Sequence, residues 1–357
     1  MEQKTMKALV YHGPGQYSLD DVPVPQIIEP GDVIGKVTLA AICTSDIHAV
    51  RGEMPGIPIP KIMGHEFCIE IVEVGPGVKH WKVGDRCVSR AASSCGECPM
   101  CKAGVRGLCV KGGVYGSVGA LEGCHAEYIR IPFADTPEFL YKIPEGLSEE
   151  NVILTPDMLA TAYYGLENAE LKAGQTVAVI GAGPVGLSIC MLAKKMYGAG
   201  RVIAVDILQN RIDLALKEGV ADVGVNAATE DAAAKILAAT GGVGVDAVVE
   251  TPGLEETMAL AAAVTRPSGI VSTIAVFAQP LVKMPMLQMI YKNHQLKMGI
   301  QKSEGVPMML EMIKDGKLDA RFILTHRAPL NDIVKGYEIF GSRQDGCVKW
   351  LVTPYER

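Results

Sequence analysis

Two short stretches in the first third of the chain combine residue types that could bind a metal ion and move a proton. Their residues are Cys43, Ser45, Asp46 and His48 in the first stretch, and Gly64, His65 and Glu66 in the second. A thiolate, an imidazole and a carboxylate are ligands of a catalytic zinc, which keeps its fourth position for water or substrate. A lone cysteine or histidine is more often a packed core residue, so these stretches leave both interpretations open.

Four more cysteines lie close together at Cys95, Cys98, Cys101 and Cys109, with the spacing C-x2-C-x2-C-x7-C. Four thiolates can close a tetrahedral site with no open position, as in a structural zinc site. Iron–sulfur proteins use C-x2-C-x2-C-x3-C-P, whereas the last gap here is seven residues and Val110 follows. We predict a structural zinc in a lobe over 95–109, with redox-active or free thiols and an iron–sulfur cluster as alternatives.

A glycine-rich turn follows a predicted strand over 176–180 and opens a predicted helix over 185–197. The turn contains Gly181, Gly183, Pro184, Val185 and Gly186. The first glycine permits a tight turn, the second lets a pyrophosphate approach the backbone, and the third lets helix and strand pack closely. The helix N-terminus then presents free N–H groups to an anion. This context predicts a dinucleotide site, and a parallel sheet whose turn binds nothing is the alternative.

The next predicted strand, over 201–205, is followed by Asp206, twenty residues after Gly186. An acidic residue at this place hydrogen-bonds the ribose hydroxyls of NAD and disfavours the 2′-phosphate of NADP. We therefore predict NAD(H) in preference to NADP(H). Arg211 lies close by in the sequence and is a candidate for contacting the cofactor, including a 2′-phosphate.

The elements that must position these residues change in character near residue 158. Before it, short β-type runs broken by Gly and Pro predict a β-rich unit, as at 7–11, 33–39 and 68–74. After it, strands predicted at 176–180, 201–205, 245–249 and 269–276 alternate with helical sequence, which indicates βαβ units and a parallel sheet. After about residue 300 the chain returns to a helix over 307–314 and a β-like end over 348–352.

Composition limits the class of protein. The length of 357 residues favours two domains, and 48% hydrophobic residues suffice for packed cores. A net charge of −6 argues against a nucleic-acid surface. The first ten residues lack the apolar stretch of a signal peptide, and no run approaches the roughly 18 apolar residues of a membrane span. We expect a cytoplasmic protein with reduced cysteines and no membrane partner.

Together, these motifs resemble the zinc-dependent medium-chain alcohol dehydrogenase family over essentially the whole chain. The two metal-binding stretches, the four-cysteine lobe, the glycine turn and the sequence Val83-Gly-Asp-Arg-Cys-Val carry the resemblance. The chain looks most like bacterial secondary-alcohol and polyol dehydrogenases of this family. In the secondary-alcohol members, an aspartate at the place of Asp157, in Thr155-Pro-Asp-Met158, is the third protein ligand of zinc.

The resemblance implies an α/β fold that joins a Rossmann doubly wound parallel sheet to a β-rich GroES-like catalytic domain. We expect the catalytic domain over 1–157, the NAD-binding Rossmann domain over 158–298, and a return to the catalytic domain over 299–357. The family likeness also implies a homo-oligomer, a dimer or a tetramer. The apolar sequence over 274–289 is our candidate for the subunit interface.

The resemblance also assigns roles to single residues. Cys43, His65 and Asp157 become ligands of a catalytic zinc, and Glu66 corresponds to a carboxylate that enters or leaves the ligand set in some relatives. Asp46 corresponds to the carboxylate that orients the ligand histidine. Ser45 would take the substrate proton and His48 would pass it outward, since a histidine titrates near neutral pH. A turn cap and a helix-surface residue are the alternatives for those last two positions.

Two further positions follow from the same likeness. Thr161 matches a threonine near the nicotinamide, and Lys349 matches a basic residue that reaches the cofactor phosphates. An ordinary helix or sheet residue is the alternative at each place. Secondary-alcohol enzymes of this kind are NADP-dependent and lack both the four-cysteine lobe and an acid at the place of Asp206. The substrate therefore does not carry over with the ligand set.

We expect a zinc-dependent NAD(P)-dependent alcohol dehydrogenase with two zinc ions per subunit, one catalytic and one structural. Bound zinc would acidify a secondary alcohol, which could then transfer a hydride to the nicotinamide. The small-molecule substrate would be a secondary alcohol or ketone. A polyol, an amino alcohol or a bulky alicyclic alcohol such as a steroid is the alternative within the same fold. Outside this class, the alternatives are a non-catalytic, zinc-stabilised dinucleotide-binding protein and a thiol-redox protein.

Overall fold

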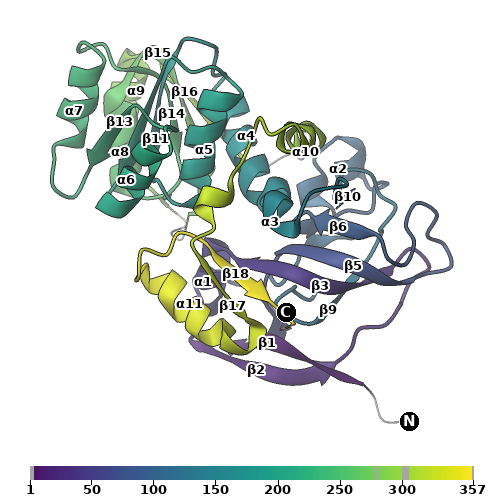
Figure 1. Cartoon of the computed structure of the whole chain (residues 1–357). Coiled ribbons are helices and arrows are strands. Elements are labelled where there is room, and N and C mark those ends of the chain that lie inside the picture. Colours follow the sequence, from purple (N-terminus) through teal and green to yellow (C-terminus); the bar gives the residue numbers. More distant parts are fainter. Residues whose placement is uncertain (1–3, 278, 280, 300–304, 356–357) are drawn as a thin grey trace. The chain divides into compact units, whose positions relative to one another are not determined.

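The computed structural model describes residues 4–277, 279, 281–299 and 305–355. The chain divides into two compact units. Unit 1 comprises Met1–Asp157 and Lys302–Arg357, and unit 2 comprises Met158–Gln301. Figure 1 shows the elements of both units, and each unit is described by itself below.

Unit 1 is built on a seven-stranded sheet with the order β10-β6-β5-β3-β18-β17, to which β9 adds by pairing with β3. These strands are β3 (Val33–Ile42), β5 (Glu66–Val74), β6 (Arg86–Ser89), β9 (Tyr128–Ile131), β10 (Leu140–Lys142), β17 (His326–Pro329) and β18 (Trp350–Thr353). Figure 1 shows the yellow C-terminal β18 beside the purple N-terminal β3, with which it pairs antiparallel. The two ends of the chain therefore complete one sheet, and the predicted β-rich GroES-like fold is confirmed.

The pairing of β3 with β5 brings the two metal-binding stretches together. Ala41 of β3 lies opposite Glu66 of β5 in this antiparallel pair. Cys43 follows the end of β3, and His65 precedes the start of β5, so both meet at the same end of the sheet. Every residue of β3 is buried or half-buried, which accounts for its nearly continuous apolar sequence.

A smaller sheet and several helices complete unit 1. Strands β1 (Thr5–Gly13) and β2 (Gln16–Pro23) form a hairpin that β4 (Lys61–Ile62) extends, and β7 (Ala92–Ser93) pairs with β8 (Gly113–Val114). The helices are α1 (Thr44–Val50), α2 (Pro99–Lys102), α3 (Glu149–Val152), α10 (Val306–Lys314) and α11 (Ile333–Ser342). Short α2 lies inside the four-cysteine lobe, and α1 begins directly after Cys43.

Unit 2 holds a six-stranded sheet with the order β13-β12-β11-β14-β15-β16, and all its pairings are parallel. Its strands are β11 (Thr176–Ile180), β12 (Arg201–Asp206), β13 (Val223–Asn226), β14 (Val245–Glu250), β15 (Thr265–Thr273) and β16 (Gln295–Met298). Its helices are α4 (Ala160–Asn168), α5 (Pro184–Lys195), α6 (Gln209–Lys217), α7 (Ala232–Ala239), α8 (Glu255–Val264) and α9 (Met286–Tyr291). This strand order is that of the doubly wound dinucleotide-binding fold, so the predicted Rossmann sheet is confirmed.

The predicted bounds differ from the structure in one informative place. A strand was predicted over 269–276, whereas β15 begins at Thr265 and ends at Thr273. Pro267 and Gly269 lie inside this strand. Because both residue types are typical of turns, the sequence does not predict that the strand begins before them. In the predicted interface over 274–289, residues 278 and 280 lie outside the described residues.

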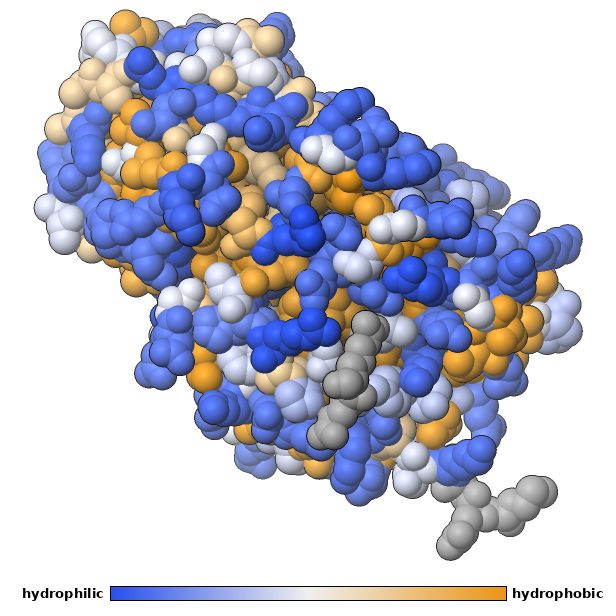
Figure 2. Space-filling model, viewed as in Figure 1, coloured by the Kyte–Doolittle hydropathy of each residue, from blue (hydrophilic) through white to orange (hydrophobic). Residues whose placement is uncertain are grey.

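The visible surface is mostly hydrophilic, with apolar patches between the polar side chains (Figure 2). In the part of the chain that the structure describes, no helix has the length and apolar character needed to cross a membrane.

Candidate metal and dinucleotide sites

Four side chains of unit 1 converge into one buried group of metal-binding atoms. One ligand atom each from Cys43, His65, Glu66 and Asp157 lies within 4.8 Å of the other three. Asp157 lies in a single π-helical turn, Thr155–Leu159, that directly precedes α4. Such turns are rare and frequently occur at functional sites. The structure therefore brings together all four residues predicted as ligands of one metal ion.

Asp46 fixes the orientation of His65 within this group. Its Oδ1 lies 3.0 Å from His65 Nδ1, while its Oδ2 accepts a hydrogen bond of 2.9 Å from the backbone N–H of Cys43. This leaves His65 Nε2 facing Asp157 Oδ2 at 3.9 Å. A carboxylate on one ring nitrogen commonly fixes the tautomer that presents the other nitrogen to a metal.

The charges in this group are closely coupled. Burial alone would raise the pKa of Asp46, but the attraction of His65 and the hydrogen bonds from His65 and Cys43 lower it to about 2. Burial alone would lower the pKa of His65, but Asp46 and Cys43 raise it well above its usual value. The buried acidic side chains of this group therefore favour a positive charge beside them. A thiol, an imidazole and a carboxylate are the donor set that zinc accepts, so the residues fit that ion.

Lys349 forms an ion pair with one member of the metal-binding group. It is fully buried, and its Nζ lies 2.5 Å from Glu66 Oε2. The two atoms are close enough for an ion pair, but their angles do not meet the geometry of a hydrogen bond. Burial raises the pKa of Glu66 to about 7, with Lys349 lowering it and Asp157 raising it. The predicted contact of Lys349 with the cofactor phosphates stays a prediction.

Replacing Lys349 with methionine is expected to lower the free energy of unfolding by about 3 kcal/mol or more, because it removes the buried cation that pairs with the Glu66 carboxylate. The double variant Glu66→Gln, Lys349→Met should recover most of this loss, since it removes both charges. Urea unfolding of both variants in one zinc-containing buffer measures the effect. A Lys349→Met variant as stable as the wild type would show that the Lys349–Glu66 ion pair does not stabilise the fold.

The two residues predicted to relay a proton occupy different surroundings. Ser45 is half-buried, and its Oγ lies 3.3 Å from His65 Nε2, at the metal-binding group. His48 lies one turn further along α1, is partly exposed, and its Nδ1 contacts the carboxylate of Glu53. The structure therefore places the hydroxyl at the metal-binding atoms and the imidazole nearer to solvent. The relay itself stays a prediction.

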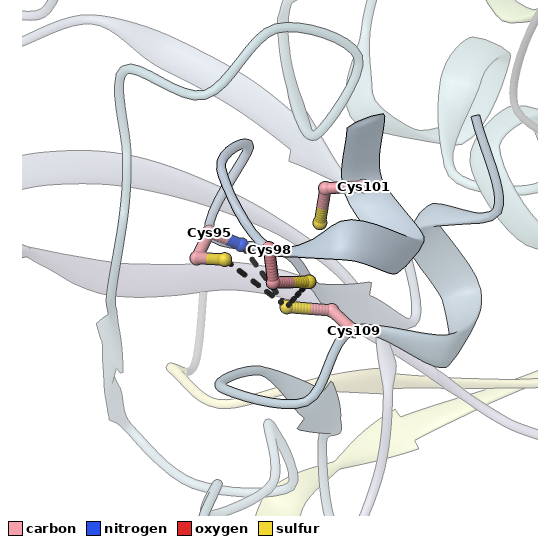
Figure 3. Close-up of side chains that lie close together, drawn as sticks. All are labelled: Cys95, Cys98, Cys101 and Cys109. Carbon is pink, nitrogen blue, oxygen red and sulfur yellow. Dashed lines mark hydrogen bonds between the residues drawn. The ribbon is translucent and has the colours of Figure 1, made fainter. Parts of the chain in front are cut away.

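The four clustered cysteines face one another (Figure 3). Ligand atoms of Cys95, Cys98, Cys101 and Cys109 lie within 4.8 Å of one another, and all four thiols are free. The Sγ of Cys109 lies 3.5 Å from that of Cys95 and 3.9 Å from that of Cys98. Backbone N–H groups of Cys101 and Val110 lower the pKa of Cys98 to about 6, which favours the thiolate that metals bind. The lobe fits a closed zinc site made by four thiolates.

In unit 2, the glycine turn has the shape that a phosphate site requires. Gly181 has a φ of 89°, and a Cβ there would lie 2.3 Å from Thr251 Oγ1. A Cβ on Gly186 would lie 1.7 Å from the carbonyl oxygen of Gly181, so neither position accepts a side chain. The N-cap of α5 is Gly183, and no side chain caps the helix, which leaves its first N–H groups available to an anion. Pro184 and Val185 form the first turn of that helix.

Asp206 ends β12 and braces the glycine turn. Its Oδ2 accepts a hydrogen bond of 2.7 Å from the N–H of Ala182, and its Oδ1 accepts one of 2.9 Å from Leu208. Arg211 on α6 lies 3.6 Å from the same carboxylate, measured from its NH1. Thr161 is a half-buried residue of α4. The structure thus gathers the turn, Asp206 and Arg211 in one place, while the assignment of these residues and of Thr161 to a cofactor stays a prediction.

Sequence reasoning missed Thr251, which supports the same turn. Its hydroxyl donates to the carbonyl oxygens of Ile180 at 3.1 Å and Gly181 at 3.2 Å. Thr251 directly follows β14, the central neighbour of β11 in the parallel sheet. Its position at the carboxyl end of a strand was the available signal, because ligand sites in such sheets lie at that edge.

Replacing Asp206 with serine is expected to lower kcat/KM for NADH by about tenfold or more and to narrow the preference over NADPH, because the acid that disfavours a 2′-phosphate is removed. Steady-state kinetics with both cofactors measure the change. Asp213→Ser is a matched control, since Asp213 is an exposed carboxylate of α6 that hydrogen-bonds only the side chain of Gln209 among the interactions found in the described residues. An unchanged cofactor ratio in Asp206→Ser would contradict the assignment.

Comparison with known proteins agrees with this architecture. Residues 29–145 match the alcohol dehydrogenase GroES-like domain, and residues 184–315 match the zinc-binding dehydrogenase domain. A probable zinc-binding alcohol dehydrogenase of Mycobacterium tuberculosis is 34% identical, with 99% of this chain and 90% of that protein covered. The chain therefore belongs to the zinc-dependent medium-chain alcohol dehydrogenase family.

Two solved structures show the same likeness in three dimensions. The alcohol dehydrogenase TADH from a Thermus species is 32% identical with a TM-score of 0.90, over 98% of this chain and 99% of that one. The zinc-dependent alcohol dehydrogenase 2 from Streptococcus pneumonia, in its apo form, is 32% identical with a TM-score of 0.91, over 99% of both chains.

Proposed function

We propose that this protein is an NAD(H)-dependent dehydrogenase that interconverts a secondary alcohol and a ketone at a zinc site made by Cys43, His65 and Asp157. The observation that carries the proposal is the convergence of these ligand atoms, with Glu66, into one buried group oriented by Asp46. When bound, zinc supplies a Lewis acid for the substrate oxygen, and the nicotinamide supplies or accepts the hydride. The cysteine lobe holds a second, structural zinc.

The residues of the chain then have separate tasks. Ser45, with its hydroxyl 3.3 Å from His65 Nε2, takes the proton of the alcohol. His48 passes this proton to solvent and is held by the Glu53 carboxylate. Burial of the ligand group limits the access of water to the metal-binding atoms. Asp206 selects NAD(H), with Arg211 beside it.

We also propose a homo-oligomer that forms through the edge of the unit 2 sheet. Within the described residues, β16 pairs only with β15, so its other edge is unpaired. Adjacent α9 exposes apolar side chains, with Leu287 70%, Ile290 72% and Tyr291 83% exposed. Contiguous exposed apolar side chains beside an unpaired strand are typical of a surface covered by another chain. Ten free cysteines, five of them in the two metal-binding groups and the other five buried, suit a reducing cytoplasm.

Turnover with both cofactors tests the proposed activity. The purified protein is expected to oxidise NADH faster than NADPH with at least one ketone in a panel of aliphatic, alicyclic and steroid ketones, and to reduce NAD⁺ with the corresponding alcohol. Loss of this turnover on zinc removal, and its return on zinc addition, would tie the activity to the metal. A zinc-loaded protein that binds NADH yet turns over no ketone or alcohol would instead support a non-catalytic binding protein.

A further inference from the structure

Arg90 lies at the end of the sheet that carries the metal-binding group. It directly follows β6, in which Ser89 lies opposite Phe67 of β5. Since β5 begins at Glu66, the next step along this antiparallel pair brings Arg90 to the level of Glu66. Its backbone N–H donates a hydrogen bond of 3.0 Å to Phe139, which holds this place in the chain.

Arg90 carries a buried guanidinium group to which the described residues provide no ion pair within 4 Å. Only 3% of the residue is exposed, and its Nε has no hydrogen bond. Among residues 4–277, 279, 281–299 and 305–355, we find no ion pair or hydrogen bond of its guanidinium group. Buried charges in proteins are as a rule paired and hydrogen-bonded, because an unpaired one loses its hydration without compensation.

The acidic groups around Arg90 have other tasks. Glu138 interacts electrostatically with Arg90, but it pairs with Arg106, whose Nε lies 3.7 Å from its Oε2. Asp157 also acts on Arg90, but it belongs to the four-residue metal-binding group, so a bound metal would take up its charge. Burial lowers the pKa of Arg90, and Tyr141, Asp157 and Glu138 offset this effect only in part. A guanidinium nevertheless keeps its charge at neutral pH.

We infer that Arg90 is a substrate-recognition residue for an oxyanion, so that the alcohol or ketone of this enzyme carries a carboxylate or a phosphate group. The inference rests on the proposed function for the reacting group and adds the class of substrate. A planar guanidinium binds either oxyanion through two parallel hydrogen bonds. Such a ligand would supply the partner that the described residues do not provide, beside the metal-binding Asp157.

Matched pairs of alcohols test the inference in the zinc-loaded protein with NAD⁺. The pairs are 3-hydroxybutyrate with its methyl ester, and glycerol 3-phosphate with glycerol. In the wild type, the charged member of at least one pair is expected to have the higher kcat/KM, and the preferred pair shows whether carboxylate or phosphate is recognised. In Arg90→Gln, the ratio of charged to neutral kcat/KM should fall at least about 30-fold, mainly through KM. Arg90→Lys should recover part of the ratio because it keeps the charge.

Two controls separate recognition from a structural role. Arg86→Gln removes a charge from β6, the strand that precedes Arg90, at a side chain 3.1 Å from Glu149, and should leave the ratio unchanged. Arg90→Gln should unfold at a temperature no lower than the wild type, because the lost charge forms no ion pair with any residue that the structure describes. Three results would each overturn the inference. The wild type could show no preference for the charged alcohol in either pair. Arg90→Gln could lower kcat/KM equally for the charged and the neutral alcohol, or it could strongly destabilise the protein.

A binding measurement distinguishes failure of this inference from failure of the proposed function. Glycerol 3-phosphate or 3-hydroxybutyrate should raise the unfolding temperature of the wild type, whereas Arg90→Gln should lose this shift. If no alcohol is turned over but the shift depends on Arg90, the oxyanion site stands and the proposed function fails. If neutral secondary alcohols are turned over and neither anion produces a shift, the proposed function stands and the inference fails.

Discussion

Asp157→Ala is expected to remove one of two zinc ions per subunit and to lower kcat/KM at least about 1,000-fold, because an open zinc site left with two strong protein ligands holds the ion weakly and misplaced. Asp157 contributes one of the four clustered donor atoms and is held in the π-helical turn before α4. Zinc analysis of dialysed protein and steady-state kinetics measure the two effects. The ion that we propose for the four cysteines should remain.

Asp319→Ala provides the matched control for this experiment. Asp319 is a carboxylate of unit 1 that pairs with Arg321 at 2.6 Å, and about half of its side chain is exposed. This variant should keep both zinc ions and full activity, since exposed ion pairs contribute little to stability. An Asp157→Ala variant that keeps two zinc ions and normal kcat/KM would contradict the assignment of Asp157 as a ligand.

Cys101→Ser is expected to remove the other zinc ion and to lower the free energy of unfolding by several kcal/mol, because binding of a structural zinc contributes directly to folding. The lobe has little else to hold it, since its regular elements are only α2 with four residues and a three-residue 3₁₀ turn, Arg106–Leu108. Zinc analysis and thermal unfolding, followed by circular dichroism, measure the two effects together.

The control for the lobe is Cys190→Ala. Cys190 is a fully buried cysteine of α5, outside both metal-binding groups. This variant should keep both zinc ions and lose only about 1 kcal/mol, the cost of a small cavity. If Cys101→Ser kept two zinc ions, or lost no more stability than Cys190→Ala, the cysteines would not form a structural zinc site.

The sequence predicts the fold class well because the strongest signals are local. The buried strands β11, β12 and β14 appear as short apolar runs, and the glycine turn lies between the first strand and its helix. The short edge strands β13 and β16 escape such reasoning. Val223–Asn226 contains a glycine, and Gln295–Met298 is largely exposed and half polar, so neither shows the apolar run of a buried strand.

The residues of the metal-binding group were also predictable, whereas the charged residues beside them were not. Cys43, His65, Glu66 and Asp157 stand in recognisable motifs, and the resemblance to known dehydrogenases supplied their roles. Glu66 and Lys349 are 283 positions apart in the sequence, and the neighbouring strands β5, β3 and β18 bring them together. No local sequence pattern predicts this pair. Arg90 looks like an ordinary residue after a strand, and only its burial without an ion pair to the described part of the chain distinguishes it.

Zinc content and turnover, followed together in one preparation, test the central claim most directly. A chelator of moderate strength is used to remove zinc stepwise from the wild-type protein, and each step is assayed for zinc per subunit and for NADH-dependent ketone reduction. We predict about two zinc ions per subunit at the start and loss of activity in proportion to the first ion removed, with recovery when zinc is restored. Full turnover by protein holding only the zinc of the cysteine lobe would contradict the account.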